Sequence, residues 1–537
     1  MKRNMIYRKY SLIVMTAICM LLISGCTDNF DDINRPRTPT EEEAKGDFFY
    51  IGVHYRALQN GVILSPANRY QYDENLSGQP YARYLTITKD NWNMTNFGVF
   101  NASDQFLNNL FNFHMTDIYG AWFELKRLLT EEDDKQNHYS WAWAELLRVA
   151  AVHRITDIYG PIPYSKIKEN SGTLQVAYDS QEDVYKGLFE DLNKAINILT
   201  EYVQSGAASQ VSAFKEYDMV YGGDFAKWLK FANSLKLRMA MRIAYVDEEN
   251  SKKYAKEALT NPGGIITSND DNAQLSVFPN PLFTMWGAYA DTRACAEIMA
   301  YMKGYEDPRL GLYFQKAAGK DEYLGMRLGI AISNHAWATG FSAPQTQEND
   351  PLLWMNAAEM AFIKAEGKAV WKWDFVTESA GDLYNEGIKL SFTQWGSTDA
   401  AATSYYGNST RKPAAFNDDG NAALSPSSIT IKWDESATDE IKQERILTQK
   451  WLALFPLGNE AWAENRRTGY PRFFPTVVSH NPDPLLKTRG ASRIPYAPQE
   501  ALDNSVNYSK ALELLGSNKD DYSTRLWWDK KANKPNF

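Results

Sequence analysis

The stretch Leu147-Arg-Val-Ala-Ala-Val-His-Arg-Ile-Thr-Asp-Ile-Tyr-Gly-Pro-Ile-Pro-Tyr164 indicates the fold class of this chain. Its apolar side chains Leu147, Ala151 and Ile155 recur at the spacing of one helix face. The pattern stops at the Gly-Pro pair within the stretch, and such a pair is typical of the end of a helix. We therefore predict a helix over residues 141–158.

Helical patterns continue on both sides of this stretch. Ser180-Gln-Glu-Asp183 forms a capping box, and the apolar stripe behind it predicts a helix that runs to Val203. Asp224 is placed to cap a further helix that runs to Ala244. More helices are predicted over residues 116–129, 291–302, 352–373, 383–392 and 439–454. Short turns join most neighbouring helices, which indicates stacked antiparallel pairs of the tetratricopeptide kind, although no fixed repeat period is visible.

Long polar segments separate several of these helices. They are rich in Gly, Asn and Ser, and they cover residues 265–280, 340–351 and 396–436. These segments are too long to be simple connectors, and long ordered loops usually carry function. We therefore expect the functional side chains in irregular segments rather than on the helices.

The first 26 residues predict export and lipidation. A basic start precedes an uninterrupted apolar run over residues 12–23, which is shorter than the ~20 residues that span a bilayer. A basic head, a short apolar core and small residues are the features of a secretory signal peptide. Ser24-Gly25-Cys26 resembles the lipobox of bacterial lipoproteins, so we expect residues 1–25 to be removed and Cys26 to carry acyl chains. An ordinary signal peptide that ends beside a Cys is the alternative.

The residues after Cys26 predict a tether followed by one large domain. Residues 26–45 are acidic and broken by Pro, and each Pro biases the residue before it away from helix. We expect this segment to be an extended, lipidated tether. Residues 46–537 then form a single domain.

The composition is that of a soluble globular protein with an ample core. Hydrophobic residues make up 44% and charged residues 23% of the 537 residues. The formal net charge of −9 argues against nucleic acid or anionic lipid as a partner, because both favour clustered Lys and Arg. Cys19 leaves with the leader and Cys26 is the anchor, so Cys295 stands alone as a small core residue. The 16 Trp, 31 Tyr and 25 Phe indicate an aromatic binding surface.

Several motifs lie in order from the anchor to near the end of the chain. They are Phe30-Asp-Asp-Ile-Asn34, the stretch 147–164, Tyr221-Gly-Gly-Asp-Phe-Ala-Lys-Trp-Leu-Lys-Phe-Ala-Asn-Ser-Leu-Lys-Leu-Arg-Met-Ala-Met-Arg-Ile-Ala244, Glu460-Ala-Trp-Ala-Glu-Asn-Arg-Arg-Thr-Gly-Tyr-Pro471 and Arg493-Ile-Pro-Tyr496. Together they resemble the SusD/RagB-type outer-membrane lipoproteins. The resemblance covers essentially the whole chain.

This resemblance implies an all-α fold, in which tetratricopeptide-like helical hairpins form a scaffold and long irregular loops build a ligand-binding face. It also implies a lipid-anchored protein on the cell surface, at the outer membrane, beside a TonB-dependent, SusC-like barrel transporter. Such proteins bind oligosaccharides, or in some members peptides, and pass them on without catalysis. The shared motifs have a scaffold interpretation, in which Arg238, Arg242, Arg466 and Arg467 pair inside the helix stack.

A sugar presents an apolar face of C–H groups and a rim of hydroxyls. Binding it without chemistry requires flat aromatic platforms beside amide, carboxylate or guanidinium side chains. Four clusters fit this description: Asn91-Trp92-Asn93, Trp286 with Tyr289, Asp291 and Arg293, Asn334-His335-Ala336-Trp337, and Trp395 with Tyr405 and Tyr406. The first three lie, by order along the chain, where the family carries its stacking aromatics. For each cluster alone, a half-buried loop aromatic is the alternative.

The sequence lacks the familiar hydrolase motifs. Its six His residues are scattered without a His-Glu-x-x-His, and Thr339-Gly-Phe-Ser-Ala-Pro344 lacks the last Gly of a nucleophile elbow. A glycosidase needs only two carboxylates at a set separation, so a surface glycosidase stays as an alternative beside peptide capture. Asn269-Asp-Asp-Asn272 lacks the spacing of a calcium loop, which favours a solvated turn over a cation site. We expect no cofactor and no metal.

Overall fold

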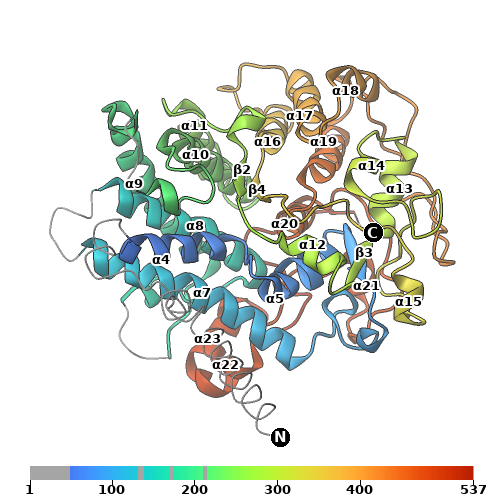
Figure 1. Ribbon diagram of the computed structural model, residues 1–537, viewed down its shortest axis with the longest axis horizontal. Coiled ribbons are helices and arrows are strands. Elements are labelled where there is room, and N and C mark those ends of the chain that lie inside the picture. Colours follow the sequence, from blue (N-terminus) through green and yellow to red (C-terminus); the bar gives the residue numbers. More distant parts are fainter. Residues whose placement is uncertain (1–48, 131–137, 170–174, 210–213, 536–537) are drawn as a thin grey trace, which may run out of the picture. The chain divides into compact units, whose positions relative to one another are not determined.

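The computed structural model describes residues 49–130, 138–169, 175–209 and 214–535 (Figure 1). The predicted signal peptide, Cys26 and the predicted tether lie outside the described residues. The chain divides into the units Met1–Tyr50 and Ile51–Phe537, and nearly all described residues belong to the second. Within the described residues, every helix is too short or too polar to cross a membrane.

The second unit is predominantly helical, which confirms the predicted all-α, tetratricopeptide-like fold. The longer helices are α4 (Phe49–Val62), α7 (Asp104–Thr130), α8 (Tyr139–Tyr159), α9 (Gln181–Gln204), α10 (Phe225–Arg242), α11 (Glu248–Thr260), α13 (Ala296–Gly304), α16 (Ala357–Ala369), α17 (Ala380–Gln394), α18 (Asp399–Tyr406), α19 (Asp439–Leu454), α20 (Gly458–Thr468) and α23 (Ser505–Leu514). Consecutive helices pack together as hairpins, notably α8 with α9, α10 with α11, and α16 with α17 (Figure 1).

Short elements fill the space between the hairpins. They are the α-helices α5 (Ala67–Tyr70), α6 (Gln79–Tyr81), α12 (Pro281–Trp286), α14 (Leu310–Tyr313), α15 (His335–Ala338), α21 (Leu485–Arg489) and α22 (Pro498–Asp503), the π-helix η1 (Gln71–Gly78), and the strands β1 (Leu85–Ile87), β2 (Ala273–Leu275), β3 (Thr292–Ala294) and β4 (Leu352–Met355). The strands form two antiparallel pairs, β1 with β3 and β2 with β4.

The predicted capping residues and the predicted terminal Gly define several helix ends. The Ser180 hydroxyl accepts a hydrogen bond from the backbone N–H of Asp183 at 3.1 Å, which completes the first turn of α9. The Asp224 carboxylate caps α10 through the N–H of Lys227, also at 3.1 Å. Gly160 ends α8 with a φ of 87°, a backbone angle that other residues rarely adopt.

Two predicted helices are wrong at their first turns, because strands occupy those residues. The helix expected from residue 291 begins only at Ala296, after β3, and the helix expected from residue 352 begins at Ala357, after β4. A short apolar run fits a strand as well as a helix. The pairing partners β1 and β2 lie far away in the sequence, and their hydrogen bonds decide the outcome.

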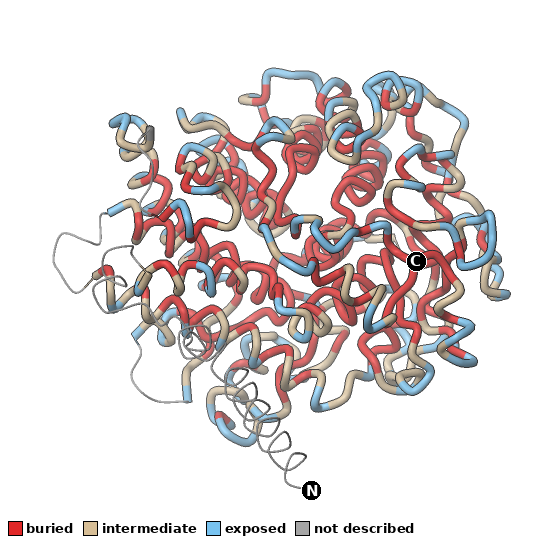
Figure 2. The backbone as a smooth tube through the Cα atoms, in the orientation of Figure 1, coloured by how far each residue is buried: buried red, intermediate tan, exposed pale blue. Residues whose placement is uncertain are grey.

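Much of the backbone inside the helix stack is buried (Figure 2). The shared arginines are buried, as predicted. Arg238 donates to both oxygens of Glu359 at 2.7 and 2.6 Å, and Arg467 donates to both oxygens of Glu366 at 2.8 and 2.6 Å. Buried charges persist only when they are paired and hydrogen-bonded, so these contacts fix how α10, α16 and α20 pack. Arg466 is held differently, because its guanidinium stacks 3.5 Å from the ring centre of Trp462 and donates to backbone carbonyls.

Candidate functional site

The strand pair β1–β3 brings two of the predicted clusters together. Thr86 lies opposite Arg293 in the antiparallel register, so the loop after β1 runs beside the loop before β3. The first loop carries Trp92, and the second carries Tyr289 and begins after Trp286, the last residue of α12. The contact continues beyond the strands, where Lys89 Nζ donates to the carbonyl of Tyr289 at 2.8 Å.

The third predicted cluster joins them through a side-chain amide. Asn93 Nδ2 donates to the carbonyl of Ile332 at 2.9 Å, and the N–H of Ile332 donates to Asn93 Oδ1 at 2.8 Å. His335 Nδ1 lies 3.2 Å from the carbonyl of Thr88. These contacts place α15, with Trp337, beside the other two loops. We call residues 88–93, 286–293 and 332–341 together the three-segment site.

The aromatic side chains of this site stay partly open to solvent, and contacts hold the rings of Trp92, Trp286 and Trp337. Tyr289 is 37% exposed and Trp337 is 36% exposed. The ring of Trp337 packs edge-on against Phe341 at 5.0 Å between centroids. Trp92 and Trp286 are half-buried, and the indole N–H of Trp286 donates to the carbonyl of Thr346 at 3.1 Å. Rings that are fixed and partly exposed meet the requirement for stacking against a sugar.

Arg293 lies at the base of the site with 8% of its surface exposed. Its Nε donates to the carbonyl of Thr339 at 3.1 Å, and its Nη1 donates to the carbonyls of Trp286 at 3.0 Å and Thr292 at 2.7 Å. Its Nη2 donates to no described residue and is not sealed from solvent. Burial lowers the pKa of Arg293 to about 10, so the guanidinium stays charged at neutral pH. Among the described residues no carboxylate neutralises it, which leaves a cation available to a ligand.

The carboxylate of Asp291 contacts other groups instead of Arg293. It is buried, it accepts a hydrogen bond from Gln71 of η1, and it lies 3.5 Å from Lys89 Nζ. Burial raises the pKa of Asp291, while Gln71 and Lys89 oppose that shift. Asp291 therefore ties the site to η1. Asn334 has a similar internal role, because its Oδ1 accepts from the N–H of Trp337 at 2.9 Å and caps α15.

In the fourth predicted cluster, the structure corrects the interpretation of Tyr405. Tyr405 is 1% exposed, its hydroxyl donates to Gln449 at 3.2 Å, and its ring lies beneath the guanidinium of Arg309. Trp395 is half-buried, with its ring 4.4 Å from that of Tyr313. The ring of Tyr405 is enclosed in the core and has no face to offer a sugar, so Tyr405 is excluded from the candidate site. Trp395 is half-buried, like Trp92 and Trp286, and stays a predicted platform.

The polar run at residues 269–272 forms a capped turn. Asn269–Asp271 is a single 3-10 turn, and the Asp271 carboxylate accepts from Lys230 Nζ at 2.7 Å. Within the described ranges, no group of three or more His, Cys, Asp or Glu side chains is placed to hold a metal ion.

Cys295 is fully buried, as its interpretation as a small core residue predicts.

Comparison with known proteins shows where this arrangement belongs. The family model described as SusD-like, "Susd and RagB outer membrane lipoprotein", matches residues 32–529. The chain belongs to the SusD/RagB family. No match was found among curated protein sequences.

Solved structures of this family are similar to the chain over almost their whole length. A SusD homolog from Bacteroides uniformis ATCC 8492 is 37% identical, with a TM-score of 0.83 over 90% of this chain and 100% of that one. A chitin-binding SusD homolog from Flavobacterium johnsoniae is 33% identical, with a TM-score of 0.84 over 91% and 100%. A SusD homolog from Bacteroides thetaiotaomicron VPI-5482 is 36% identical, with a TM-score of 0.81 over 90% and 99%.

Proposed function

We propose that this SusD/RagB protein captures oligosaccharides at the cell surface and delivers them to a TonB-dependent outer-membrane transporter without cleaving them. One observation carries the proposal. Three segments far apart in sequence are joined by hydrogen bonds, and they carry the half-buried or partly exposed residues Trp92, Trp286, Tyr289 and Trp337, while Arg293 donates to backbone carbonyls of two of the segments. The chitin-binding description of a similar structure supports carbohydrate as the ligand class.

The chemistry of the three-segment site suits a sugar. The rings of Tyr289 and Trp337 offer flat apolar faces for C–H groups, and Arg293 Nη2 offers a charged donor for a hydroxyl. Cleavage would require two carboxylates on either side of a glycosidic bond. Asp291, the carboxylate of the predicted clusters, is instead hydrogen-bonded inward. This inward contact of Asp291 supports binding rather than hydrolysis at the site.

The surface location is part of the same proposal. The family description as an outer membrane lipoprotein supports residues 1–25 as a signal peptide and Cys26 as the lipidated residue. Residues 26–45 would then be the tether and residues 46–537 the binding domain. A lipid anchor at Cys26 would keep the domain next to a SusC-like transporter in the same membrane.

A RagB-like capture of peptides is the second candidate. The observation that favours it is again Arg293, whose cation has no carboxylate partner among the described residues. A peptide carboxylate would satisfy this cation better than a sugar hydroxyl does, because charge-assisted hydrogen bonds are the stronger ones.

Titration calorimetry of the protein lacking residues 1–26 tests the proposal. The ligands are a panel of oligosaccharides, including chitin fragments, and a set of short peptides. Trp337→Ala should weaken glycan binding about tenfold, equivalent to ~1.4 kcal/mol, through loss of ring stacking. Trp433→Ala is the matched control, since Trp433 is a half-buried Trp on the segment 396–436, away from the site.

The outcomes separate the candidates. Peptide binding with no glycan binding would replace the proposal by peptide capture. Release of reducing ends from any bound glycan would make the protein a glycosidase.

A further inference from the structure

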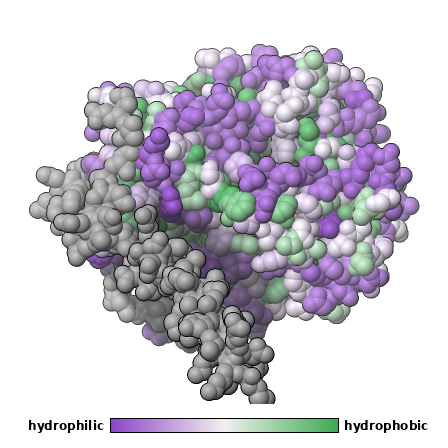
Figure 3. Space-filling model, in the orientation of Figure 1, coloured by the Kyte–Doolittle hydropathy of each residue, from purple (hydrophilic) through white to green (hydrophobic). Residues whose placement is uncertain are grey.

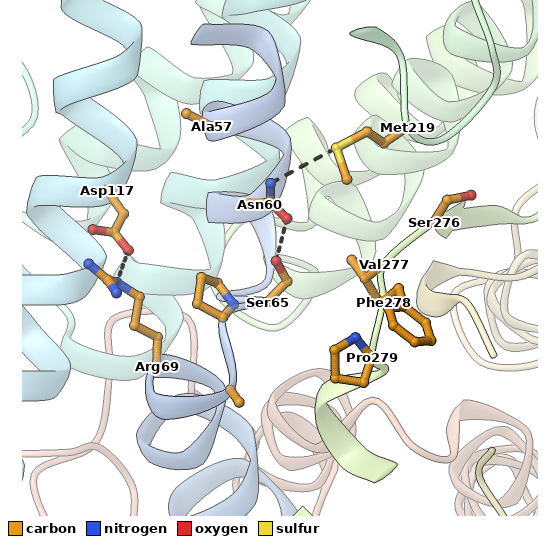
Figure 4. Close-up of a pocket in the computed structure, with 12 residues that line it drawn as sticks. Ala57, Asn60, Ser65, Arg69, Asp117, Met219, Ser276, Val277, Phe278 and Pro279 are labelled. Atoms are coloured by element: carbon orange, nitrogen blue, oxygen red, sulfur yellow. Dashed lines mark hydrogen bonds and ion pairs between the residues drawn. The ribbon is translucent and has the colours of Figure 1, made fainter. Parts of the chain in front are cut away.

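A groove outside the three-segment site lies between the end of α4, the start of α5 and residues 276–279. Its volume is about 590 Å³, within the ~300–1,000 Å³ that is usual for small-molecule sites. Figure 4 shows Val277 and Pro279 along one wall and the Arg69–Asp117 pair on the opposite wall. On the face seen in Figure 3, hydrophobic residues form small patches within a largely hydrophilic surface.

Phe278 stands at the rim of this groove and is 72% exposed. Among the described residues, no other large aromatic side chain is as exposed. Water-exposed apolar rings cost free energy unless something covers them, so a bound molecule that covers Phe278 gains hydrophobic contact.

The segment that carries Phe278 is held rigidly at both ends. The N–H of Ser276 donates to the carbonyl of Met219 at 2.8 Å, and the N–H of Asn280 donates to the carbonyl of Glu348 at 2.8 Å. The Asn280 side chain both caps α12 and donates to the carbonyl of Asp350 at 2.9 Å. Because the backbone of this segment is already held, a ligand that stacks on Phe278 has only the side chain to order.

The opposite wall supplies polar groups. Arg69 and Asp117 form an ion pair whose side chains are 31% and 22% exposed, and the Arg69 guanidinium lies 4.8 Å from the ring centre of Phe113. Ser276 adds an exposed hydroxyl to the rim. A ligand for this groove must match one apolar ring and several hydrogen-bonding groups at once. A sugar has that combination, whereas a purely apolar molecule would leave the ion pair desolvated and unsatisfied.

The groove is also close to the three-segment site. Phe278 lies just before α12, and Trp286 is the last residue of that helix. A helix of 6 residues is about 9 Å long, so the two aromatic positions flank a short element. In Figure 1, α12 lies between α5 and β3.

We propose that the groove is a second sugar subsite, which binds a distal unit of an oligosaccharide whose other end occupies the three-segment site. Phe278 is the stacking platform, and the Arg69–Asp117 pair and Ser276 receive the hydroxyls. The inference rests on the proposed capture of oligosaccharides. It adds that affinity increases with chain length, because only chains that extend past α12 reach the second ring.

Binding measurements over chain length test this inference. The probes are an array of linear oligosaccharides from two to eight units, including chitin and starch fragments, applied to the protein lacking residues 1–26. For each series that binds, Phe278→Ala should weaken the longer chains about two- to tenfold and leave the disaccharides unchanged. Trp337→Ala should weaken every length. Phe278→Tyr keeps the ring and should keep the affinity, and Leu424→Ala, at an apolar position that is 87% exposed, is the control for the loss of surface area.

Each outcome supports or contradicts the second subsite. If Trp337→Ala weakens binding but Phe278→Ala changes no chain length, the second subsite is wrong and the proposed function stands. If Phe278→Ala weakens all lengths equally, Phe278 belongs to a single site and the chain-length inference is wrong. If no oligosaccharide binds the unaltered protein, the proposed function and the subsite both fail. An unchanged unfolding temperature shows that the highly exposed Phe278 was replaced without damage to the fold.

Discussion

Asn93 and Ile332 are joined by a pair of hydrogen bonds between the side-chain amide of one and the backbone of the other. The two N···O distances are 2.9 and 2.8 Å. Among the contacts of the described residues 88–93 and 332–341, no other side chain both donates to and accepts from the backbone of a single residue. Because residue 332 is far along the chain, this pair sets the distance between Trp92 and Trp337.

Asn93→Ala should therefore weaken glycan binding more than it lowers stability. The change removes both hydrogen bonds, each worth ~0.5–1.5 kcal/mol, and frees the segment that carries Trp337. Calorimetric affinity and unfolding temperature should be measured together. Asn101→Ala is the control, since Asn101 makes one side-chain hydrogen bond, to the carbonyl of Met94 at 2.8 Å. Equal affinity for Asn93→Ala and the unaltered protein would contradict the role assigned to the pair.

Arg293→Met should disorder the site without unfolding the protein. The substitution leaves the carbonyls of Trp286 and Thr339 without their charged donor, and such hydrogen bonds are worth ~1.5–3 kcal/mol each. We expect at least a tenfold loss of glycan affinity and faster amide hydrogen exchange over residues 286–290 and 337–340. Arg293→Lys keeps the charge but loses the fork of donors, so it should restore only part of the affinity. Unchanged exchange in both segments would show that Arg293 does not hold them.

Sequence predicts well the features of this fold that depend on neighbouring residues. The caps at Ser180 and Asp224 and the end of α8 at Gly160 follow from a few adjacent side chains. The buried pairing of Arg238 and Arg467 was predictable for another reason. Charged residues on an otherwise apolar helix face must find partners when that face is buried.

The candidate site depends on contacts that a single sequence does not display. β3 is a strand because β1 pairs with it, and the two are more than 200 residues apart. Neighbouring residues in the sequence do not decide the exposure of a side chain either. Trp337 and Tyr405 both have polar residues within three positions in the sequence, but one reaches the surface and the other packs under Arg309. Phe278 was missed because it follows a Val and precedes a Pro. Its position within the long segment 265–280 is the signal that points to it.

Stability should fall as the pH rises towards neutrality, through the buried carboxyl of Glu74. Glu74 accepts from Arg154 Nη2 at 2.7 Å and from the N–H of Asn459 at 3.2 Å. Burial raises its pKa from 4.5 to about 7, although Arg154 opposes the shift. The folded state thus holds this proton more tightly than the unfolded chain. The stabilising contribution is complete below about pH 4.5 and is lost as the pH rises through about 7.

Glu74→Gln removes this titration. Between about pH 5 and pH 7.5, the unfolding temperature of the unaltered protein should fall more steeply than that of the variant. Differential scanning fluorimetry across that range measures both slopes. Glu182→Gln is the control, because Glu182 is exposed on α9 and should leave the slope unchanged. Parallel slopes for Glu74→Gln and the unaltered protein would assign the pH dependence to other groups.

Arg242→Met should destabilise the scaffold without a specific effect on the ligand. Arg242 is 1% exposed, and it pairs with Glu460, with Glu464 at 2.5 Å and with Asp157 at 3.2 Å. Burial alone would raise the pKa of Glu464, but Arg467, Lys450 and Arg242 hold it well below its ordinary value. Removal of one partner from such a buried network costs ~3–5 kcal/mol, because the remaining charges stay desolvated.

Urea unfolding followed by tryptophan fluorescence measures this loss, and calorimetry below the transition measures the glycan affinity of the folded fraction. Arg127→Met is the matched control, since Arg127 pairs with Glu124 on the surface of α7 with both side chains at least 44% exposed. A surface pair of this kind contributes at most ~1 kcal/mol. If Arg242→Met instead kept full stability and lost glycan binding, the arginine-containing motifs of α10 and α20 would act on the ligand. In that case the separation of a paired-charge scaffold from a loop-built binding face would not describe this protein.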